Sequence, residues 1–285
     1  MVTIDDYKGN DTTWCPGCGN FAILNGIRQA LAGLGIAPHQ VVMYSGIGQA
    51  AKLPLYTRGN VLNGLHGRAL PMATGSSFAD HTIKTLVFGG DGDGFAEGGN
   101  HFLHAIRRNP DIAYIAHNNQ VYGLTKGQAS PTSDPGFVTG TTPEGVSYER
   151  FNPAAVAISL NATFVARTHT GVMTHMVEMM KLAIEHKGFS FLEVLQPCVT
   201  YNKVNTLKWY RERSYDLADD KDYDPADREV AWKKALEWGD KFPIGIILRS
   251  ERPTMTDRLK VLEQQPLNRR PSRPRDVRPL LDNFR

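Results

Sequence analysis

Long hydrophobic runs and paired cysteines are both scarce in this sequence. No apolar stretch reaches the roughly 18 residues that a membrane-spanning helix needs. The first residues carry no apolar signal core, so we expect neither a membrane span nor secretion. The three cysteines are an odd number, which does not suit a disulfide framework and favours a reducing compartment. We therefore expect a cytoplasmic protein.

Acidic residues are missing from residues 12–79, which contain no Asp or Glu. Within this segment, Gly46-x-Gly48-x-x-Ala51 follows a strand-like run and resembles a dinucleotide-binding fingerprint. Such a site requires an acidic residue about 20 positions later to bind the ribose, so the NAD interpretation fails. Basic residues are present here, namely Arg28, Lys52, Arg58 and Arg68. Their positive field suits a diphosphate or another anionic ligand.

A basic excess is confined to the C-terminal tail. The formal net charge is +3, and residues 251–285 hold nine Lys and Arg against five Asp and Glu, which leaves the rest close to neutral. The sequence therefore has no basic footprint for binding nucleic acid. We expect the Arg- and Pro-rich tail to be either an arm over a partner subunit or disordered.

Strand-like and helix-like segments alternate to about residue 200, which predicts an α/β fold with a doubly wound parallel sheet. The expected strands are Val41–Ser45, Thr85–Gly89, Ile112–Ala116, Thr163–Arg167 and Phe191–Leu195. The expected helices are Phe21–Leu34, Asn100–Arg108 and Gly171–His186. The long segment Thr125–Glu149, rich in Thr, Ser, Pro and Gly, is expected to be a loop over the active site.

A smaller region follows residue 205. Asp224-Pro225 predicts the start of a helix over Ala226–Trp238, and Gly239 predicts its end. Ile244–Leu248 reads as a final strand. We expect a ligand-binding unit over residues 1–205 and a C-terminal extension over residues 206–285.

The most informative motif is Gly90-Asp91-Gly92, which 26 residues separate from Asn119. Both end apolar, strand-like runs, so a carboxylate and a carboxamide are expected at adjacent carboxyl ends of parallel strands, where ligands bind. Their oxygens, together with phosphate oxygens, suit Mg²⁺. The glycines allow a phosphate to approach the start of a helix. The pattern favours a Mg²⁺-diphosphate clamp over the alternative, a simple tight turn.

Two cysteines surround a Pro-Gly turn in Cys15-Pro16-Gly17-Cys18. This spacing suits an iron–sulfur cluster, half of a zinc site or a redox pair. A zinc site normally has a second close pair of ligands, which the sequence lacks, and thioredoxin-like pairs belong near the start of a βαβ unit. The residues alone leave the three alternatives open.

Taken together, these motifs carry a resemblance to thiamine diphosphate enzymes, and more narrowly to the β subunit of 2-oxoacid:ferredoxin oxidoreductases. The resemblance covers about residues 12–210. It rests on the clamp, the cysteine motif and further segments in the same order, namely Gly64–Ala69, Tyr122–Gln128, Gln196–Cys198 and Thr200–Asn202. It implies that Asp91, Asn119 and the carbonyl of Val121 hold Mg²⁺, and that the sheet has the diphosphate-binding fold of these enzymes.

The resemblance also implies roles for further residues. Lys126 is expected to face the substrate carboxylate, and His66 to lie near the cofactor, both as catalytic residues. Asp93 is expected to contact the diphosphate or to orient the carboxylate of Asp91. The expected cofactor-binding residues are Gly46, Ile47, Gly48, His66, Gly90, Asp91, Gly92, Asp93, Asn119, Val121, Gly123, Leu124 and Thr125.

One ligand of the cluster expected from the resemblance is absent. The family carries a 4Fe–4S cluster on four cysteines, and Cys15, Cys18 and Cys198 match three of them. The usual Gly-Ile-Gly-Cys reads Gly46-Ile47-Gly48-Gln49 here. Glutamine is a poor iron ligand beside thiolate. The cluster is therefore expected either to have one non-cysteine ligand or an open iron, or to be a three-iron form, or to be absent.

The implied function is oxidative, CoA-dependent decarboxylation of a 2-oxoacid, with ferredoxin accepting the electrons. Because the chain has only the diphosphate half, we expect an obligate α subunit that supplies the aminopyrimidine domain, in an (αβ)₂ assembly. Overall similarity, including Tyr201–Thr206 and the basic tail, favours 2-oxoglutarate over pyruvate. Two other classes stay open. One is half of a non-redox thiamine decarboxylase, and the other is a noncatalytic metal-binding assembly subunit.

Overall fold

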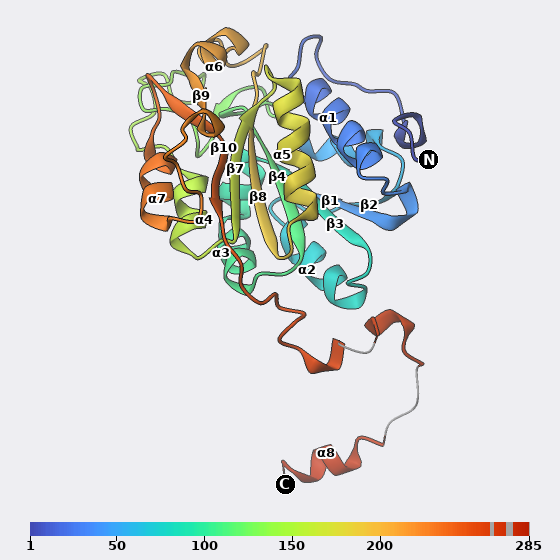
Figure 1. The fold of residues 1–285 in the computed structure, drawn as a ribbon. Helices are drawn as coiled ribbons and strands as arrows, with labels where there is room; N and C mark the ends of the chain where they lie inside the picture. The colour runs from blue at the N-terminus through green and yellow to red at the C-terminus, as the bar shows by residue number, and fades with distance from the viewer. Residues whose placement is uncertain (263–264, 272–275, 285) are drawn as a thin grey trace.

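The computed structural model describes residues 1–262, 265–271 and 276–284, and its centre is a single eight-stranded sheet (Figure 1). The strand order is β2-β1-β3-β4-β8-β7-β10-β9. All neighbouring strands are parallel except β10, which runs antiparallel to β7. The strands are β1 Val41–Ser45, β2 Asn60–Asn63, β3 Lys84–Gly90, β4 Ile112–Asn118, β7 Phe164–His169, β8 Phe189–Leu195, β9 Ser214–Asp216 and β10 Phe242–Arg249; β5 Val121–Tyr122 and β6 Gln128–Ala129 form a separate hairpin.

Helices cover both faces of the sheet, because its central strands are apolar on both sides. On β4, Ala113 and Ile115 pack in the cluster that contains α1 and α5, whereas Tyr114 and Ala116 pack in the cluster that contains α2, α3, α4 and α7. These helices are α1 Asn20–Gly33, α2 Ala69–Ala79, α3 Gly99–Arg108, α4 Pro153–Ser159, α5 Met173–Glu185 and α7 Arg228–Leu236. The predicted doubly wound α/β fold is confirmed.

The remaining helical segments are short. They are α6 Leu207–Arg213, α8 Arg278–Asp282, the 3₁₀ turns η1 Asp5–Tyr7, η2 Pro38–Gln40, η3 Ala50–Tyr56, η5 Leu217–Asp219, η6 Lys260–Leu262 and η7 Leu267–Arg269, and one π-helical turn, η4 Gly92–Glu97. The π-helical turn begins directly after Asp91. Such turns are uncommon and occur often at functional sites.

The direction of the chain changes between β1 and β3. After β1 the chain forms β2 on one side, and it then returns to place β3 on the other side. The loops that leave β1 and β3 therefore separate and open a crevice at the carboxyl edge of the sheet, which is the usual ligand site of such folds.

The predicted start of the helix near residue 226 is wrong. Asp224 accepts a hydrogen bond from the N–H of Ala226 (2.8 Å) and closes a turn instead. The N-cap is Asp227, whose carboxylate accepts from the N–H groups of Glu229 and Val230. The helix also ends at Leu236, before the predicted Trp238, and Trp238 packs against Phe242.

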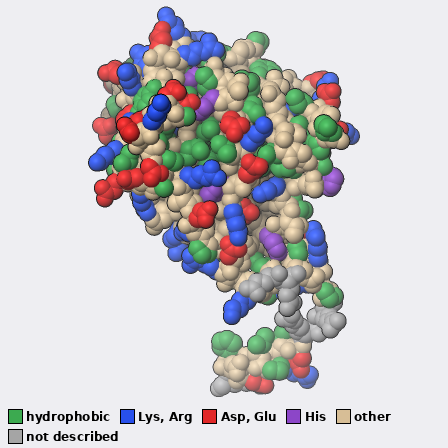
Figure 2. Space-filling model, in the orientation of Figure 1, with side chains coloured by type: hydrophobic (Ala, Val, Ile, Leu, Met, Phe, Trp, Pro, Cys, Tyr) green, Lys and Arg blue, Asp and Glu red, His purple; other side chains and the backbone are tan. Residues whose placement is uncertain are grey.

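The C-terminal tail leaves the body of the molecule after β10 (Figure 1). Its first part contacts the body, since Leu262 is buried and the guanidinium of Arg269 binds the carboxylate of Asp80 at 3.1 Å. The segment with α8 stands apart in Figure 1, and Figure 2 shows hydrophobic side chains at its surface. Leu280 and Phe284 are among its exposed residues. Residues 263–264, 272–275 and 285 of the expected arm lie outside the described residues. Within the described parts of the chain, no helix combines the length and the apolar character needed to cross a membrane.

Candidate functional site

A pocket lies at the crevice between the loops that follow β1 and β3. Twelve of the thirteen expected cofactor-binding residues line it: Ile47, Gly48, His66, Gly90, Asp91, Gly92, Asp93, Asn119, Val121, Gly123, Leu124 and Thr125. The remaining one, Gly46, lies behind the lining, where an added Cβ would fall 2.2 Å from an oxygen of Asp93. The structure thus brings these residues together. We call this site the cofactor pocket.

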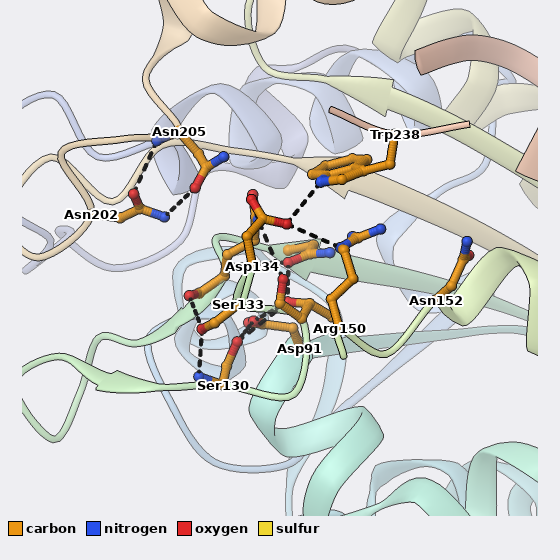
Figure 3. Close-up of polar contacts among 12 residues, drawn as sticks. Asp91, Ser130, Ser133, Asp134, Arg150, Asn152, Asn202, Asn205 and Trp238 are labelled. Atoms are coloured by element: carbon orange, nitrogen blue, oxygen red, sulfur yellow. Dashed lines mark hydrogen bonds and ion pairs between the residues drawn. The ribbon is translucent and has the colours of Figure 1, made fainter. Parts of the chain in front are cut away.

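Asp91 is buried at the base of the cofactor pocket, with 2% of its surface exposed. Its Oδ2 accepts hydrogen bonds from the hydroxyls of Ser130 and Thr132, the latter at 2.7 Å (Figure 3). Burial raises the pKa of Asp91 to about 6, although these hydroxyls oppose the shift. The carboxylate is therefore held in position but lacks a compensating positive charge.

A polar network continues from Asp91 into the sheet. The hydroxyl of Thr132 also lies 2.8 Å from Oδ1 of Asn118, so its one proton can go to either oxygen. The amide of Asn118 donates to Glu193 (2.8 Å). Glu193 pairs with Arg167 at 2.7 Å, and both side chains are fully buried. The charge of Arg167 holds the pKa of Glu193 below its usual range despite burial. The base of the pocket is thus supported by paired groups.

Ser130 and Thr132 were missed by the sequence analysis, although both lie in the predicted active-site loop. That loop crosses the base of the pocket, and Ser133 donates to the carbonyl of Gln120 at 2.7 Å (Figure 3). Asp134 lies between the indole of Trp238 (2.8 Å) and Arg150 (3.4 Å). Ser and Thr residues in this loop follow no helical or strand period. Their only sequence signal as site residues was that they cluster inside a long loop.

Asn119 begins a sharp turn into β5. Its Oδ1 accepts from the N–H of Val121 (3.1 Å), and its carbonyl accepts from the amide of Asn202 (3.1 Å). Gln120 has a left-handed backbone (φ 59°), which reverses the chain direction. Asn119 and Val121 therefore both line the pocket in which Asp91 lies.

Asp93 joins three loops. Its Oδ1 accepts from the N–H of Ile47 (2.9 Å), the N–H of Gly67 (2.8 Å) and Nδ1 of His66 (2.7 Å). An added Cβ at Gly46 would occupy the same space as this carboxylate, which explains the glycine. Burial raises the pKa of Asp93, and these donors oppose the shift. Among the described residues, the side chain of Asp93 hydrogen-bonds to these loops and not to Asp91.

The structure does not bring Lys126 into the cofactor pocket. Lys126 is exposed on the turn between β5 and β6 and is not part of the lining. Its backbone is left-handed (φ 78°), which is uncommon for a lysine. His66, in contrast, lines the pocket.

His117 also lines the pocket and was not predicted. Its Nδ1 lies 2.8 Å from Oδ1 of Asn20, which also accepts from the amide of Gln196 at 3.1 Å. Burial lowers the pKa of His117 to about 3, so the ring is neutral at physiological pH. The ring thus links the pocket to Asn20, two residues after Cys18.

The three cysteines converge on a second pocket, whose lining also includes Trp14 and Gln49. We call it the cysteine pocket. The N–H of Cys18 donates to the carbonyl of Cys15 (3.0 Å), and Gly17 has a φ of +80°, as the third residue of a type II turn does. Gly19 has no side chain, so Gln196 and Pro197 pack on it and bring Cys198 close. The thiols are free, and burial raises the pKa of Cys18, with its two cysteine neighbours adding to the shift.

Among the described residues, no three or more His, Cys, Asp or Glu side chains form a site for a single metal ion. A Mg²⁺ site built from Asp91, Asn119 and the carbonyl of Val121 would use only one such side chain, and an iron–sulfur cluster would space its thiolates farther apart than a single ion does.

Comparisons with known proteins agree with this geometry. Residues 37–194 match the family described as the thiamine pyrophosphate enzyme C-terminal TPP-binding domain. Residues 198–264 match the C-terminal region of the pyruvate ferredoxin oxidoreductase β subunit.

Individual relatives point to the same family. The chain is 45% identical to the β subunit of 2-oxoacid:ferredoxin oxidoreductase from Saccharolobus solfataricus, over 84% of this chain and 82% of the relative. It is 35% identical to the KorB subunit of 2-oxoglutarate synthase from Methanocaldococcus jannaschii, over 88% and 93%.

A solved structure is also similar. It is the 2-oxoglutarate:ferredoxin oxidoreductase from Magnetococcus marinus with 2-oxoglutarate, coenzyme A and succinyl-CoA bound. The TM-score is 0.86 and the identity 39%, over 89% of this chain and 87% of that chain. The fold, the thiamine-type pocket and these relatives together show that the chain belongs to the family of 2-oxoacid:ferredoxin oxidoreductase β subunits.

Proposed function

We propose that this chain is the β subunit of an enzyme that converts 2-oxoglutarate and coenzyme A reversibly to succinyl-CoA and CO₂, with ferredoxin as the electron carrier. The observation that carries the proposal is that the cofactor pocket and the cysteine pocket share Gln49, Asn119 and Gly123 in their linings. Electrons released at the first pocket therefore have an acceptor site directly beside it. A non-redox decarboxylase has no use for this second pocket.

The residues of the cofactor pocket fit thiamine diphosphate with Mg²⁺. Asp91, Asn119 and the carbonyl of Val121 would hold the ion. Asp91 is a buried carboxylate with a raised pKa, and a hard cation supplies the charge that it lacks. Gly90 and Gly92 line the pocket at the start of the π-helical turn, where the diphosphate would lie. When bound, thiamine diphosphate supplies the electron sink for decarboxylation.

The side chains that line the same pocket support the proposal of an obligate α subunit. In the described chain, the only carboxylates that line it are Asp91 and Asp93, and both are committed to hydrogen bonds within this subunit. The carboxylate that activates the aminopyrimidine therefore comes from the partner. Exposed apolar side chains in the linings of the two pockets suit a covering subunit, namely Leu124, Val199 and Tyr201.

The choice of 2-oxoglutarate rests on the relatives, because one is a 2-oxoglutarate synthase subunit and the solved structure contains 2-oxoglutarate and succinyl-CoA. Lys126 lies on an exposed turn beside the pocket residues Leu124 and Thr125. We propose that it contacts the substrate carboxylate once the α subunit covers this turn, with His66 nearer the cofactor.

The remaining parts of the proposal concern assembly. We propose an (αβ)₂ enzyme in the cytoplasm, with the tail after residue 250 lying as an arm over a partner subunit. The exposed Leu280 and Leu281 of α8 support this role for the tail. We also propose that the chain consists of a ligand-binding unit over residues 1–205 and a C-terminal extension over residues 206–285. The second family match, which begins at residue 198, supports this division.

One observation favours a second candidate function. Gln49 stands where the family usually has its fourth cysteine, so a non-redox thiamine decarboxylase half with a vestigial cysteine pocket is the alternative. Iron and sulfide analysis, with EPR of the reduced complex, separates the two. A complex that binds thiamine diphosphate but gives no paramagnetic species on reduction favours the decarboxylase.

The test of the proposed function is the cofactor content of the chain co-purified with its α subunit. We expect the complex to retain thiamine diphosphate and Mg²⁺, and Asp91→Ala to lose both, because the buried carboxylate is the only charged ligand proposed for the ion. Asp240→Ala is the matched control, since Asp240 is exposed and far from the lining in sequence. Equal thiamine diphosphate content in the wild-type and Asp91→Ala complexes contradicts the proposed role of Asp91. Absence of the cofactor from all three complexes contradicts the proposed function and leaves the noncatalytic assembly role.

A further inference from the structure

The wall of the cysteine pocket holds three thiols and side-chain oxygens of Gln49, Asn20, Asn119, Thr200 and Tyr201. Of these oxygens, only Oε1 of Gln49 is buried without a hydrogen-bond partner among the described residues. Two independent contacts place Gln49 with the thiols. An added Cβ at Gly123 would lie 3.8 Å from both the Sγ of Cys198 and the Cγ of Gln49. The indole of Trp14, next to Cys15, donates to the carbonyl of Gln49 at 2.9 Å.

The side-chain oxygen of Gln49 is left without a partner. Its Oε1 is buried, and none of the described residues donates a hydrogen bond to it. A buried acceptor without a donor is destabilising, and such atoms are rare in folded proteins. The main chain of Gln49 is held in place by Trp14, so the position of this oxygen is not a consequence of a loose loop. The atom is therefore available to a ligand that the described residues do not provide.

We propose that Oε1 of Gln49 is the fourth protein ligand of the cluster, so that three corners of a 4Fe–4S cluster have thiolate ligands and one has a carboxamide oxygen. This inference rests on the iron–sulfur cluster of the proposed function, and it selects one of the alternatives that the sequence left open. A neutral oxygen donor satisfies the buried acceptor and binds iron less tightly than thiolate does. The iron at this corner is therefore exchangeable.

Two consequences follow from this ligand set. First, loss of one thiolate charge raises the reduction potential of the cluster relative to a four-thiolate site. Second, one-electron oxidation releases the weakly held iron. Ferricyanide takes one electron from the resting [4Fe–4S]²⁺ core, and the resulting [4Fe–4S]³⁺ core loses Fe²⁺ to leave [3Fe–4S]⁺, so charge and iron balance. Gln49 lines both pockets, so this corner lies on their shared wall.

The test uses the α–β complex purified without oxygen, with the variants Gln49→Cys and Gln49→Leu. Iron and sulfide content, EPR and the midpoint potential of the cluster are measured before and after ferricyanide. Gln29→Leu, a half-buried glutamine on α1, is the matched control. The thiamine diphosphate content of every complex reports whether the variant folds and assembles.

We expect the wild-type complex to contain about four irons per β chain and to fall to about three after oxidation, with the EPR signal of an oxidised three-iron cluster. Gln49→Leu is expected to contain the three-iron form before any oxidant is added. Gln49→Cys is expected to keep its fourth iron through the same treatment and to have a lower midpoint potential. Gln29→Leu is expected to match the wild type.

The proposal is overturned if Gln49→Leu and the wild type have the same iron content and the same sensitivity to ferricyanide. It is also overturned if the wild type contains thiamine diphosphate but no iron, and in that case the thiamine-dependent function stands alone. A complex with neither thiamine diphosphate nor iron contradicts the proposed function itself.

Discussion

The cofactor pocket and the cysteine pocket share a wall but differ in how the protein holds the groups proposed to bind their ligands. In the cofactor pocket, Asp91 and Asp93 accept hydrogen bonds from five donors on neighbouring loops. In the cysteine pocket, none of the three cysteines forms a disulfide, and Oε1 of Gln49 has no donor among the described residues. The carboxylates of the first pocket are therefore positioned by the protein itself, whereas the second pocket leaves one proposed ligand without a partner.

The largest expected effect comes from breaking the support beneath the cofactor pocket. Arg167→Ala leaves the carboxylate of Glu193 fully buried without its ion pair, which should destabilise the complex by about 3–5 kcal/mol. Chemical unfolding monitored by circular dichroism measures this change. Iron content per folded chain should be less affected than thiamine diphosphate content, because the network of Glu193 leads to Asp91.

A double variant controls for the loss of packing in that experiment. Arg167→Leu with Glu193→Leu removes both charges, so it should be clearly less destabilised than Arg167→Ala. Equal destabilisation of the two variants would mean that the buried charge is not the cause.

The next effect is a pH dependence that distinguishes the two pockets. The pKa of Asp91 is about 6 in the folded, Mg²⁺-free protein and near 3.8 when unfolded. Deprotonation is therefore harder in the folded state, so Mg²⁺-free protein should lose about 3 kcal/mol of stability as the pH rises from about 4 to about 6. Urea unfolding at several pH values, compared with Asp91→Asn, measures this contribution.

Addition of Mg²⁺ and thiamine diphosphate sharpens the pH experiment. Above pH 6, the bound cation should restore the stability that the wild type loses when Asp91 is deprotonated. It should have no such effect on Asp91→Asn, which has no carboxylate at this position. Parallel stability curves for the two proteins across the whole range, without ligands, would refute the buried-carboxylate explanation.

The smallest effect should be confined to the cysteine pocket. Trp14→Phe removes the indole donor to the carbonyl of Gln49, a loss of about 1 kcal/mol, since the N–H of Lys52 remains 3.4 Å from that carbonyl. We expect faster loss of iron on oxidation and an unchanged content of thiamine diphosphate. A parallel fall in both would show that the two pockets are not organised separately.

Much of the cofactor pocket was predictable because its residues lie at the ends of apolar strands. Gly90 ends β3, Asp91 follows it and Asn119 follows β4, and parallel strands bring their carboxyl ends to one edge. The hydroxyls on Asp91 were not predictable in the same way, because Ser130 and Thr132 come from about 40 residues away in a loop without periodicity.

Other predictions from the sequence differ from the structure because tertiary contacts override local sequence signals. The run Ala69–Ala79 forms α2, which was not predicted, because its small and apolar residues have no polar face to mark a helical period. Asp224-Pro225 is a helix-start signal, but the chain turns there and Asp227 provides the cap instead. Whether Oε1 of Gln49 has a hydrogen-bond donor depends on the residues that surround it in the fold, and the local sequence does not reveal this.

Gly123 has a consequence for any attempt to redesign this protein. Its missing side chain leaves a gap bordered by the amide of Asn119, the thiol of Cys198 and the side chain of Gln49. A larger residue there would press at once on a proposed magnesium ligand and on two proposed iron ligands. A substitution at Gly123 would therefore change the proposed decarboxylation site and the proposed electron-transfer site together.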